Sequence, residues 1–190
     1  MSKKKINLFI NGIPATVDPG TMILDAAKEI GITIPTLCYH KDLCIAGNCR
    51  VCVVEIAGQK RLSAACATPV EEGMEILTNT LKVRNSRKHI IELLLSEHNA
   101  DCTKCYRNGN CELQHLASEY KIMTQEFIDL VPLKTYSIDM FSPSIIKDNS
   151  KCIRCQRCVR TCAVLQGVNA LTVAHKGDEM IISTFMNKPM

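Results

Sequence analysis

Three groups of cysteines, one of which includes a histidine, are the residues of this sequence best suited to chemistry. The middle group has the spacing H-x3-C-x2-C-x5-C and consists of His98, Cys102, Cys105 and Cys111. The group before it and the group after it are Cys38, Cys49, Cys52 and Cys66, and Cys152, Cys155, Cys158 and Cys162. Thiolates and imidazoles are the ligands of zinc and of iron-sulfur clusters. The pattern therefore predicts three metal sites in series, and we favour iron-sulfur clusters that pass electrons.

Disulfides are the first alternative use of twelve cysteines in 190 residues. The start of the chain is basic, but residues 6–10 are a short alternating segment where a signal peptide needs a continuous apolar run. No stretch approaches the roughly 18 apolar residues of a membrane span. We therefore expect a cytoplasmic protein without a membrane span, in which thiols stay reduced and a disulfide framework is disfavoured.

The overall charge and composition argue against nucleic acid as a partner. The formal net charge is +4, but this value counts every cysteine as neutral. Thiolate-held clusters carry net negative charge, so the loaded protein is expected near about −1. Four Tyr, four Phe and no Trp also provide little material for stacking on bases. No acid-base pair, nucleophile constellation or phosphate-binding loop stands out, so we assign no catalytic residue.

The first group is expected in a small module formed by residues 1–79. Alternating apolar residues over 6–10 and 13–17, around an Asn-Gly turn, predict a hairpin. Pro14 within the second arm places that arm at a sheet edge.

A helix and further short strands should complete this module. Thr21 is a good N-cap and Gly31 a good stop for a helix between them. Short strands are expected within 51–56, 62–67 and 74–77.

The histidine-bearing group is expected between two helices in a module formed by residues 80–125. Thr80 can cap a helix that runs to about Glu97 and delivers His98, and a second helix should follow Cys111. The first half of the first helix carries three cations, Arg84, Arg87 and Lys88. We interpret them as a solvated face, with a docking surface for an acidic partner as the alternative.

The third group has the most specific spacing and is expected in residues 126–190. Its C-x2-C-x2-C-x3-C run, after an irregular connector over 131–143, is that of bacterial ferredoxins, with Ala163 where proline is usual. Three thiols in one tight turn can bind three corners of a [4Fe-4S] cube. A single zinc ion needs four ligands on one centre, so this spacing disfavours zinc. A hairpin is predicted over 171–184.

The fourth ligand of this cube is open. In two-cluster ferredoxins the last cysteine of the run serves the other cluster, and a second run supplies the missing thiolate. No second run follows before Met190. Either Cys162 completes the cube, or the sequence is the front part of a longer protein.

Taken together, the three motifs resemble the N-terminal iron-sulfur region of NAD(P)H-linked iron-only ([FeFe]) hydrogenases of the electron-bifurcating type. The same module occurs in the large iron-sulfur subunit of respiratory complex I. The first group, with spacing C-x10-C-x2-C-x13-C, resembles their [2Fe-2S] site. The middle group resembles their histidine-ligated [4Fe-4S] site, and the order of the motifs agrees. Zinc remains the alternative for both groups.

The resemblance implies an α+β chain with a β-grasp [2Fe-2S] ferredoxin domain, a small helical domain with the histidine-ligated cluster, and a ferredoxin-like half-domain. It implies one [2Fe-2S] and two [4Fe-4S] clusters, with a third [4Fe-4S] if the chain continues. Cys44 fits no ligand set and is interpreted as a structural thiol.

The same resemblance implies a relay that carries electrons between an NAD(P)H-oxidising flavin/iron-sulfur subunit and a diiron hydrogenase centre. Further implied partners are a small thioredoxin-like [2Fe-2S] subunit and a ferredoxin. The alternatives are an iron-sulfur subunit of a complex I-like or formate dehydrogenase enzyme and, from another class, a zinc-stabilised interaction module. The residues do not distinguish NADH from NADPH. They also do not specify the terminal acceptor, the direction of electron flow or the oligomeric state.

Overall fold

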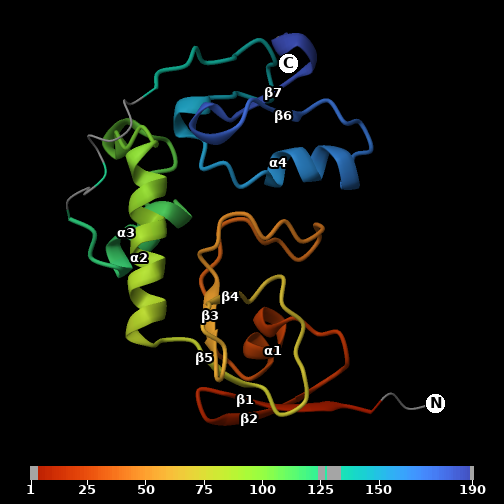
Figure 1. Ribbon diagram of the computed structural model, residues 1–190. Helices are drawn as coiled ribbons and strands as arrows, with labels where there is room; N and C mark the ends of the chain where they lie inside the picture. The colour runs from red at the N-terminus through yellow and green to blue at the C-terminus, as the bar shows by residue number, and fades with distance from the viewer. Residues whose placement is uncertain (1–3, 124–126, 128–133, 189–190) are drawn as a thin grey trace. The chain divides into compact units, whose positions relative to one another are not determined.

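The computed structural model describes residues 4–123, 127 and 134–188 (Figure 1). The chain divides into two compact units, Met1–Leu37 with Ile45–Ile90, and Cys38–Cys44 with Ile91–Met190. The finer division into three modules stays a prediction. Within the described residues, none of the helices has the length and apolar character that crossing a membrane requires.

The first unit is built on a five-stranded sheet with the order β2-β1-β5-β3-β4. Its strands are β1 (Ile6–Ile10), β2 (Ile13–Val17), β3 (Val53–Ile56), β4 (Ser63–Ala64) and β5 (Glu75–Leu77). The β1–β2 hairpin is confirmed, because Ile10 pairs with Ile13 across a turn in which Asn11 and Gly12 have φ angles of +53° and +79°. Pro14 lies on β2, at the edge of the sheet as predicted.

The sheet is mixed and a helix accompanies it, so the predicted α+β class is confirmed. Strand β1 is parallel to β5, which pairs antiparallel with β3. Helix α1 (Ile23–Glu29) ends as predicted before Gly31, whose φ of +78° is open to glycine without strain. The predicted N-cap is wrong: Met22 occupies that position, and the Thr21 hydroxyl instead donates to the Asp18 carbonyl in the preceding turn.

The core of this unit consists of buried apolar residues of the sheet and of α1, among them Leu8, Ile10, Ile23 and Ala26. Ile76 on β5 is fully buried between β1 and β3. We expect Ile76→Ala to lower the free energy of unfolding by about 2–5 kcal/mol, because it removes buried methyl groups and leaves a cavity. Denaturant unfolding followed by circular dichroism measures the change. Ile13→Ala is the control, because Ile13 is 47% exposed and its truncation should change stability by less than about 0.5 kcal/mol; equal losses in the two variants would contradict the assignment of the core.

Helix α2 (Leu81–Ser96) is capped as predicted, since the Thr80 hydroxyl accepts a hydrogen bond from the Val83 amide at 3.2 Å. One of the cations assigned to a solvated face is misplaced. Arg87 is only 4% exposed, and its guanidinium donates to the Val53 carbonyl at 2.7 Å. The long aliphatic stem of arginine lets it bury while its head satisfies a backbone carbonyl. Arg84 is exposed, in agreement with the prediction.

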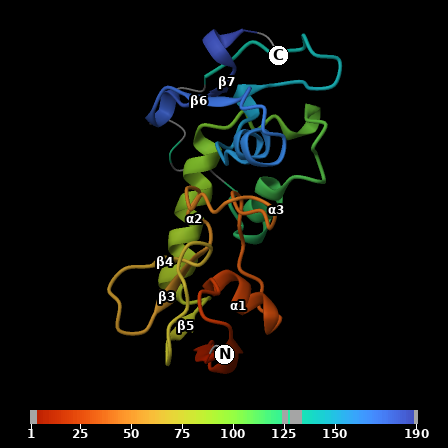
Figure 2. The same cartoon turned by 90° about the vertical axis from the view of Figure 1, so that its right-hand side faces the viewer.

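The second unit consists of short elements between long irregular segments (Figure 2). Its helices and strands are α3 (Glu112–Glu119), α4 (Arg157–Arg160), a π-helix over Thr161–Leu165, β6 (Thr172–Ala174) and β7 (Ile181–Ser183). Short 3₁₀-helices cover Cys102–Lys104, Asn149–Lys151, Gly177–Glu179 and Phe185–Asn187. Strands β6 and β7 pair antiparallel, which confirms the predicted hairpin. The connector is irregular over its described part, while residues 131–133 lie outside the described residues.

Candidate iron-sulfur sites

The histidine-bearing group lines a cavity of about 460 Å³ in the second unit. His98, Cys105 and Cys111 are on its walls, whereas Cys102 lies one 3₁₀ turn away and its carbonyl accepts from the Cys105 amide at 3.1 Å. Helix α3 begins immediately after Cys111 and α2 ends shortly before His98, so the ligand loop lies between two helices as predicted.

The surroundings of this cavity suit an anionic group with ligands on its walls. Three cations, Lys104, Arg107 and Lys151, line it against two carboxylates, Glu112 and Asp148, together with apolar residues that include Leu113 and Ile153. Cations near a cluster compensate the net negative charge of its thiolates, and an apolar wall limits access of water. Within the described residues no three His, Cys, Asp or Glu side chains gather closely enough for a single ion. A four-iron core is larger than one ion and holds its ligands farther apart.

His98 is held in the form that binds metal. Burial lowers the pKa of its imidazole, and the positive charge of Lys151 lowers it further, against the opposing charge of Asp148. The neutral ring is therefore favoured, and it is the neutral ring that ligates metals. Its Nδ1 atom is buried without a hydrogen-bond partner in the described part of the chain. A buried polar atom of this kind fits an imidazole that belongs to a metal site.

The first three cysteines of the third group, Cys152, Cys155 and Cys158, lie in one turn in which their charges act on one another. Burial raises the pKa of Cys152, and the negative charge of Cys155 raises it further. The sulfur of Cys158 is partly covered, which raises its pKa, and the charges of Cys152 and Cys155 add to the effect. Thiolates that repel one another in a partly buried turn require a positive core to stay ionised, and an iron-sulfide core supplies it.

The backbone of this turn has a conformation that the sequence did not predict. Arg154 and Gln156, which separate the cysteines, have φ angles of +55° and +58°. Residues other than glycine adopt this left-handed conformation infrequently, and it curls the chain so that amides point inward. The Arg154 amide donates to the Cys152 sulfur at 3.3 Å. Amide donors of this kind stabilise the electron-rich, reduced state of a cluster.

Cys162 lies apart from this turn, within the π-helix Thr161–Leu165. Its sulfur accepts from the Ala170 amide at 3.2 Å, and its carbonyl accepts from the Val168 amide at 3.0 Å. A π-helix inserts one residue into the helical turn and is frequently found at functional sites.

The first group is divided between the two units. Cys52 and Cys66 are each 1% exposed in the first unit, and their sulfurs lie 3.4 Å apart. This approaches the about 3.8 Å between two sulfurs on one tetrahedral metal ion with bonds of about 2.3 Å. Cys49 is partly exposed in the same unit. Cys38 is buried and belongs to the second unit, so its grouping with the other three stays a prediction.

No disulfide joins the twelve cysteines, all of which lie among the described residues, and one of them has surroundings that differ from expectation. Cys44 is exposed, whereas a structural thiol is usually buried. The backbone carbonyl of Cys44 accepts a hydrogen bond from the Arg160 guanidinium at 2.5 Å.

Within the second unit, two arginines in the turn of the third group form ion pairs with residues adjacent to ligands of the histidine-bearing group. Arg154 pairs with Glu97, the neighbour of His98, and also donates to the Asp178 carbonyl at 2.6 Å. Arg157 binds Glu112, the neighbour of Cys111, through two hydrogen bonds of 2.7 and 3.0 Å. Paired bonds between a guanidinium and a carboxylate give directional as well as electrostatic stabilisation. Both ligand turns are therefore fixed by residues adjacent to the ligands.

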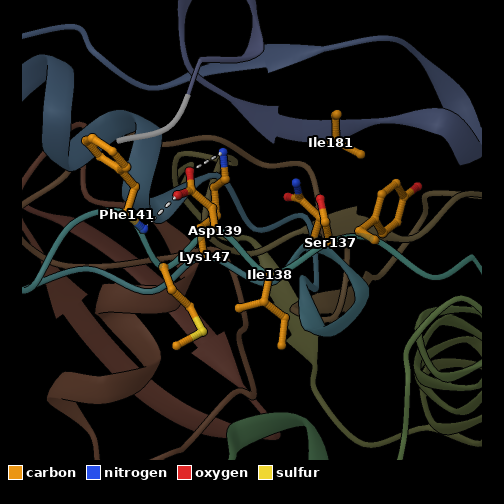
Figure 3. Close-up of a pocket in the computed structure, with 9 residues that line it drawn as sticks. Ser137, Ile138, Asp139, Phe141, Lys147 and Ile181 are labelled. Atoms are coloured by element: carbon orange, nitrogen blue, oxygen red, sulfur yellow. Dashed lines mark hydrogen bonds and ion pairs between the residues drawn. The ribbon is translucent and has the colours of Figure 1, made fainter.

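A second cavity of about 440 Å³ contains none of the predicted ligands (Figure 3). Its lining includes Tyr136, Phe141 and Ile181. The side chains of Asp139 and Lys147, which also line it, form an ion pair at 3.5 Å, and their backbones are bridged. Because each of these charges satisfies the other, the cavity offers no spare charged group for chemistry.

The order of domains along the chain matches known iron-sulfur proteins. A 2Fe-2S iron-sulfur cluster binding domain matches residues 3–81, and the iron-sulfur binding region of NADH-ubiquinone oxidoreductase-G matches residues 87–126. The ferredoxin-like domain of NADH-quinone oxidoreductase subunit 3 matches residues 142–190. A crystal structure of an NAD⁺-reducing [NiFe]-hydrogenase in the H₂-reduced state superposes with a TM-score of 0.87 and 30% identity, covering 94% of this chain and 74% of that one. The chain belongs to the family of iron-sulfur electron-transfer modules shared by NAD(P)-linked hydrogenases and complex I.

Curated members of this module family are longer proteins. The NADP-reducing hydrogenase subunit HndD of Solidesulfovibrio fructosivorans is 46% identical over 86% of this chain. The mitochondrial 78 kDa subunit of NADH-ubiquinone oxidoreductase of Candida albicans is 32% identical over 97% of it. The alpha subunit of the NADPH-Fe(3+) oxidoreductase of Geobacter sulfurreducens is 38% identical over 97%. The chain spans 22 to 30% of the length of these three relatives.

Proposed function

We propose that this chain is the electron-relay segment of an NAD(P)-linked oxidoreductase, with a hydrogenase of the [FeFe] type as the preferred whole enzyme. The observation that carries the proposal is the agreement between three ligand motifs and three family matches in the same order. Iron-sulfur clusters supply one-electron transfer when bound. The chain contributes binding, orientation and electrostatics.

Each proposed site uses ligands that the sequence groups together. A [2Fe-2S] cluster is assigned to the first group and a [4Fe-4S] cluster to each of the others. The strand order of the first unit, with a central parallel pair, supports a β-grasp domain for the first cluster. The cavity that His98 shares with Cys105 and Cys111 supports the second site, and the coupled thiols around Cys155 support the third.

A flavoprotein partner that oxidises NAD(P)H is the proposed source or acceptor of electrons, since the matched relatives are named for NAD- and NADP-linked reactions. A small thioredoxin-like [2Fe-2S] subunit and a ferredoxin are further proposed partners, and a cytoplasmic location is proposed with them. A complex I-like enzyme is the second candidate, because its 78 kDa subunit aligns over 97% of this chain.

An anaerobic redox titration followed by EPR tests the relay. The reconstituted chain should show separate one-electron components that return on reoxidation, and NADH or NADPH should reduce them only when a flavin-containing NAD(P)H dehydrogenase subunit is added. Absence of any reversible one-electron signal in a chain that binds metal would overturn the proposal and favour the zinc-stabilised interaction module.

A further inference from the structure

Arg160 is a buried cation that the ligand assignments leave unused. It is the last residue of α4 and is only 8% exposed. Its Nη2 atom donates to the Cys38 carbonyl and, at 3.3 Å, to the Cys155 carbonyl. Its Nη1 atom donates to the Cys44 carbonyl. All of these residues belong to the second unit.

The charge of Arg160 has no carboxylate to compensate it among the described residues. The ion pairs of neighbouring arginines go to Glu97 and Glu112, whereas Arg160 meets only backbone carbonyls, and its Nε is buried without a partner there. A buried, uncompensated charge is costly unless an anion lies close to it. A core of charge +2 held by four thiolates carries net negative charge, and Cys155 is a ligand proposed for such a group.

We propose that Arg160 is a positioning residue that fixes the Cys38–Cys44 segment against the Cys155 turn and, through its charge, raises the reduction potential of the cluster assigned to the third group. Because Nη2 donates to the carbonyls of both Cys38 and Cys155, it fixes these two residues relative to each other. The positive charge favours the reduced state of this cluster, because reduction adds one electron and therefore one negative charge. This inference rests on the proposed ligand sets, and it adds to them a residue that binds no iron.

The three carbonyl acceptors around Arg160 require an arginine rather than another cation. The guanidinium is a planar fork that can donate to several acceptors at once, whereas a lysine ammonium is a compact charge on a flexible stem. Arg160→Lys therefore keeps the charge and loses part of the fork. Arg160→Gln loses both the charge and the fork, and Arg84→Gln removes an equal charge from an exposed position as the control.

Hydrogen exchange and redox titration of the cluster-loaded chain separate the two parts of the proposal. In Arg160→Gln we expect amides of residues 39–44 to exchange faster, and the cluster held by Cys155 to show a tenfold lower ratio of reduced to oxidised form at fixed potential, which is 59 mV for one electron. Arg160→Lys should keep the potentials near those of the parent while exchange over 39–44 still rises. Arg84→Gln should change neither quantity.

Two results would overturn the inference. Unchanged exchange over residues 39–44 in Arg160→Gln would show that the guanidinium does not fix this segment. An unchanged potential of the Cys155 cluster in the same variant would show that the charge of Arg160 does not act on this cluster. If the parent chain itself holds no clusters, the proposed function fails, while hydrogen exchange of the cluster-free parent and Arg160→Gln still decides whether Arg160 fixes the segment. Should Arg160→Gln not fold, the exchange result for Arg160→Lys decides the positioning role.

Discussion

Replacing Cys155 with alanine is expected to remove about four iron atoms and four sulfides per chain, the content of one [4Fe-4S] cluster. Cys155 is the central thiol of its turn, and its charge acts on both Cys152 and Cys158. Alanine leaves one corner of the cube without a ligand, and a cluster with an open corner on a partly exposed turn is readily lost. Metal analysis together with EPR of the reduced protein measures the loss.

Cys44→Ala is the matched control, because it removes one thiol from the same unit without touching a proposed ligand set. Its iron content and EPR spectrum should equal those of the parent chain. If Cys155→Ala keeps all its iron, Cys155 is not a ligand. If Cys44→Ala loses as much iron as Cys155→Ala, the ligand assignment of the third group is wrong.

The second large effect is expected at His98. Replacing this imidazole with the thiolate of cysteine adds one negative charge to the ligand set, which makes reduction harder. We expect the midpoint potential of one [4Fe-4S] cluster to fall by on the order of 100 mV, judged from the higher potentials of histidine-ligated Rieske centres. An EPR-monitored titration of His98→Cys measures the shift.

His115→Cys controls for the added thiol, since His115 lies on α3 in the same unit but is exposed and lines no cavity described above. Its titration curves should match those of the parent. Identical curves for the parent and His98→Cys would show that His98 is not a ligand.

Local patterns in the sequence predicted local structure well. The Asn11-Gly12 turn predicted its hairpin because the positive φ angles of this turn suit those two residues. Thr80 was recognised as a cap because its partner, Val83, is three residues away. Cys152, Cys155 and Cys158 lie in one turn because two residues separate each from the next.

Features that depend on distant parts of the chain were missed. Arg87 looked like a surface cation, and its burial depends on Val53, which lies 34 residues away. The contacts of Arg160 span 116 and 122 residues, to Cys44 and Cys38. No periodicity or spacing reveals such contacts. A cation directly between two closely spaced ligand cysteines is the one signal that could have drawn attention to Arg160.

The central claim is that these thiolates and one imidazole hold iron-sulfide cores. Quantitative analysis of iron, acid-labile sulfide and zinc in the anaerobically purified chain tests it most directly. Filled sites should give about ten iron atoms and about ten sulfides per chain, from one two-iron and two four-iron clusters. Stoichiometric zinc without acid-labile sulfide would contradict the claim.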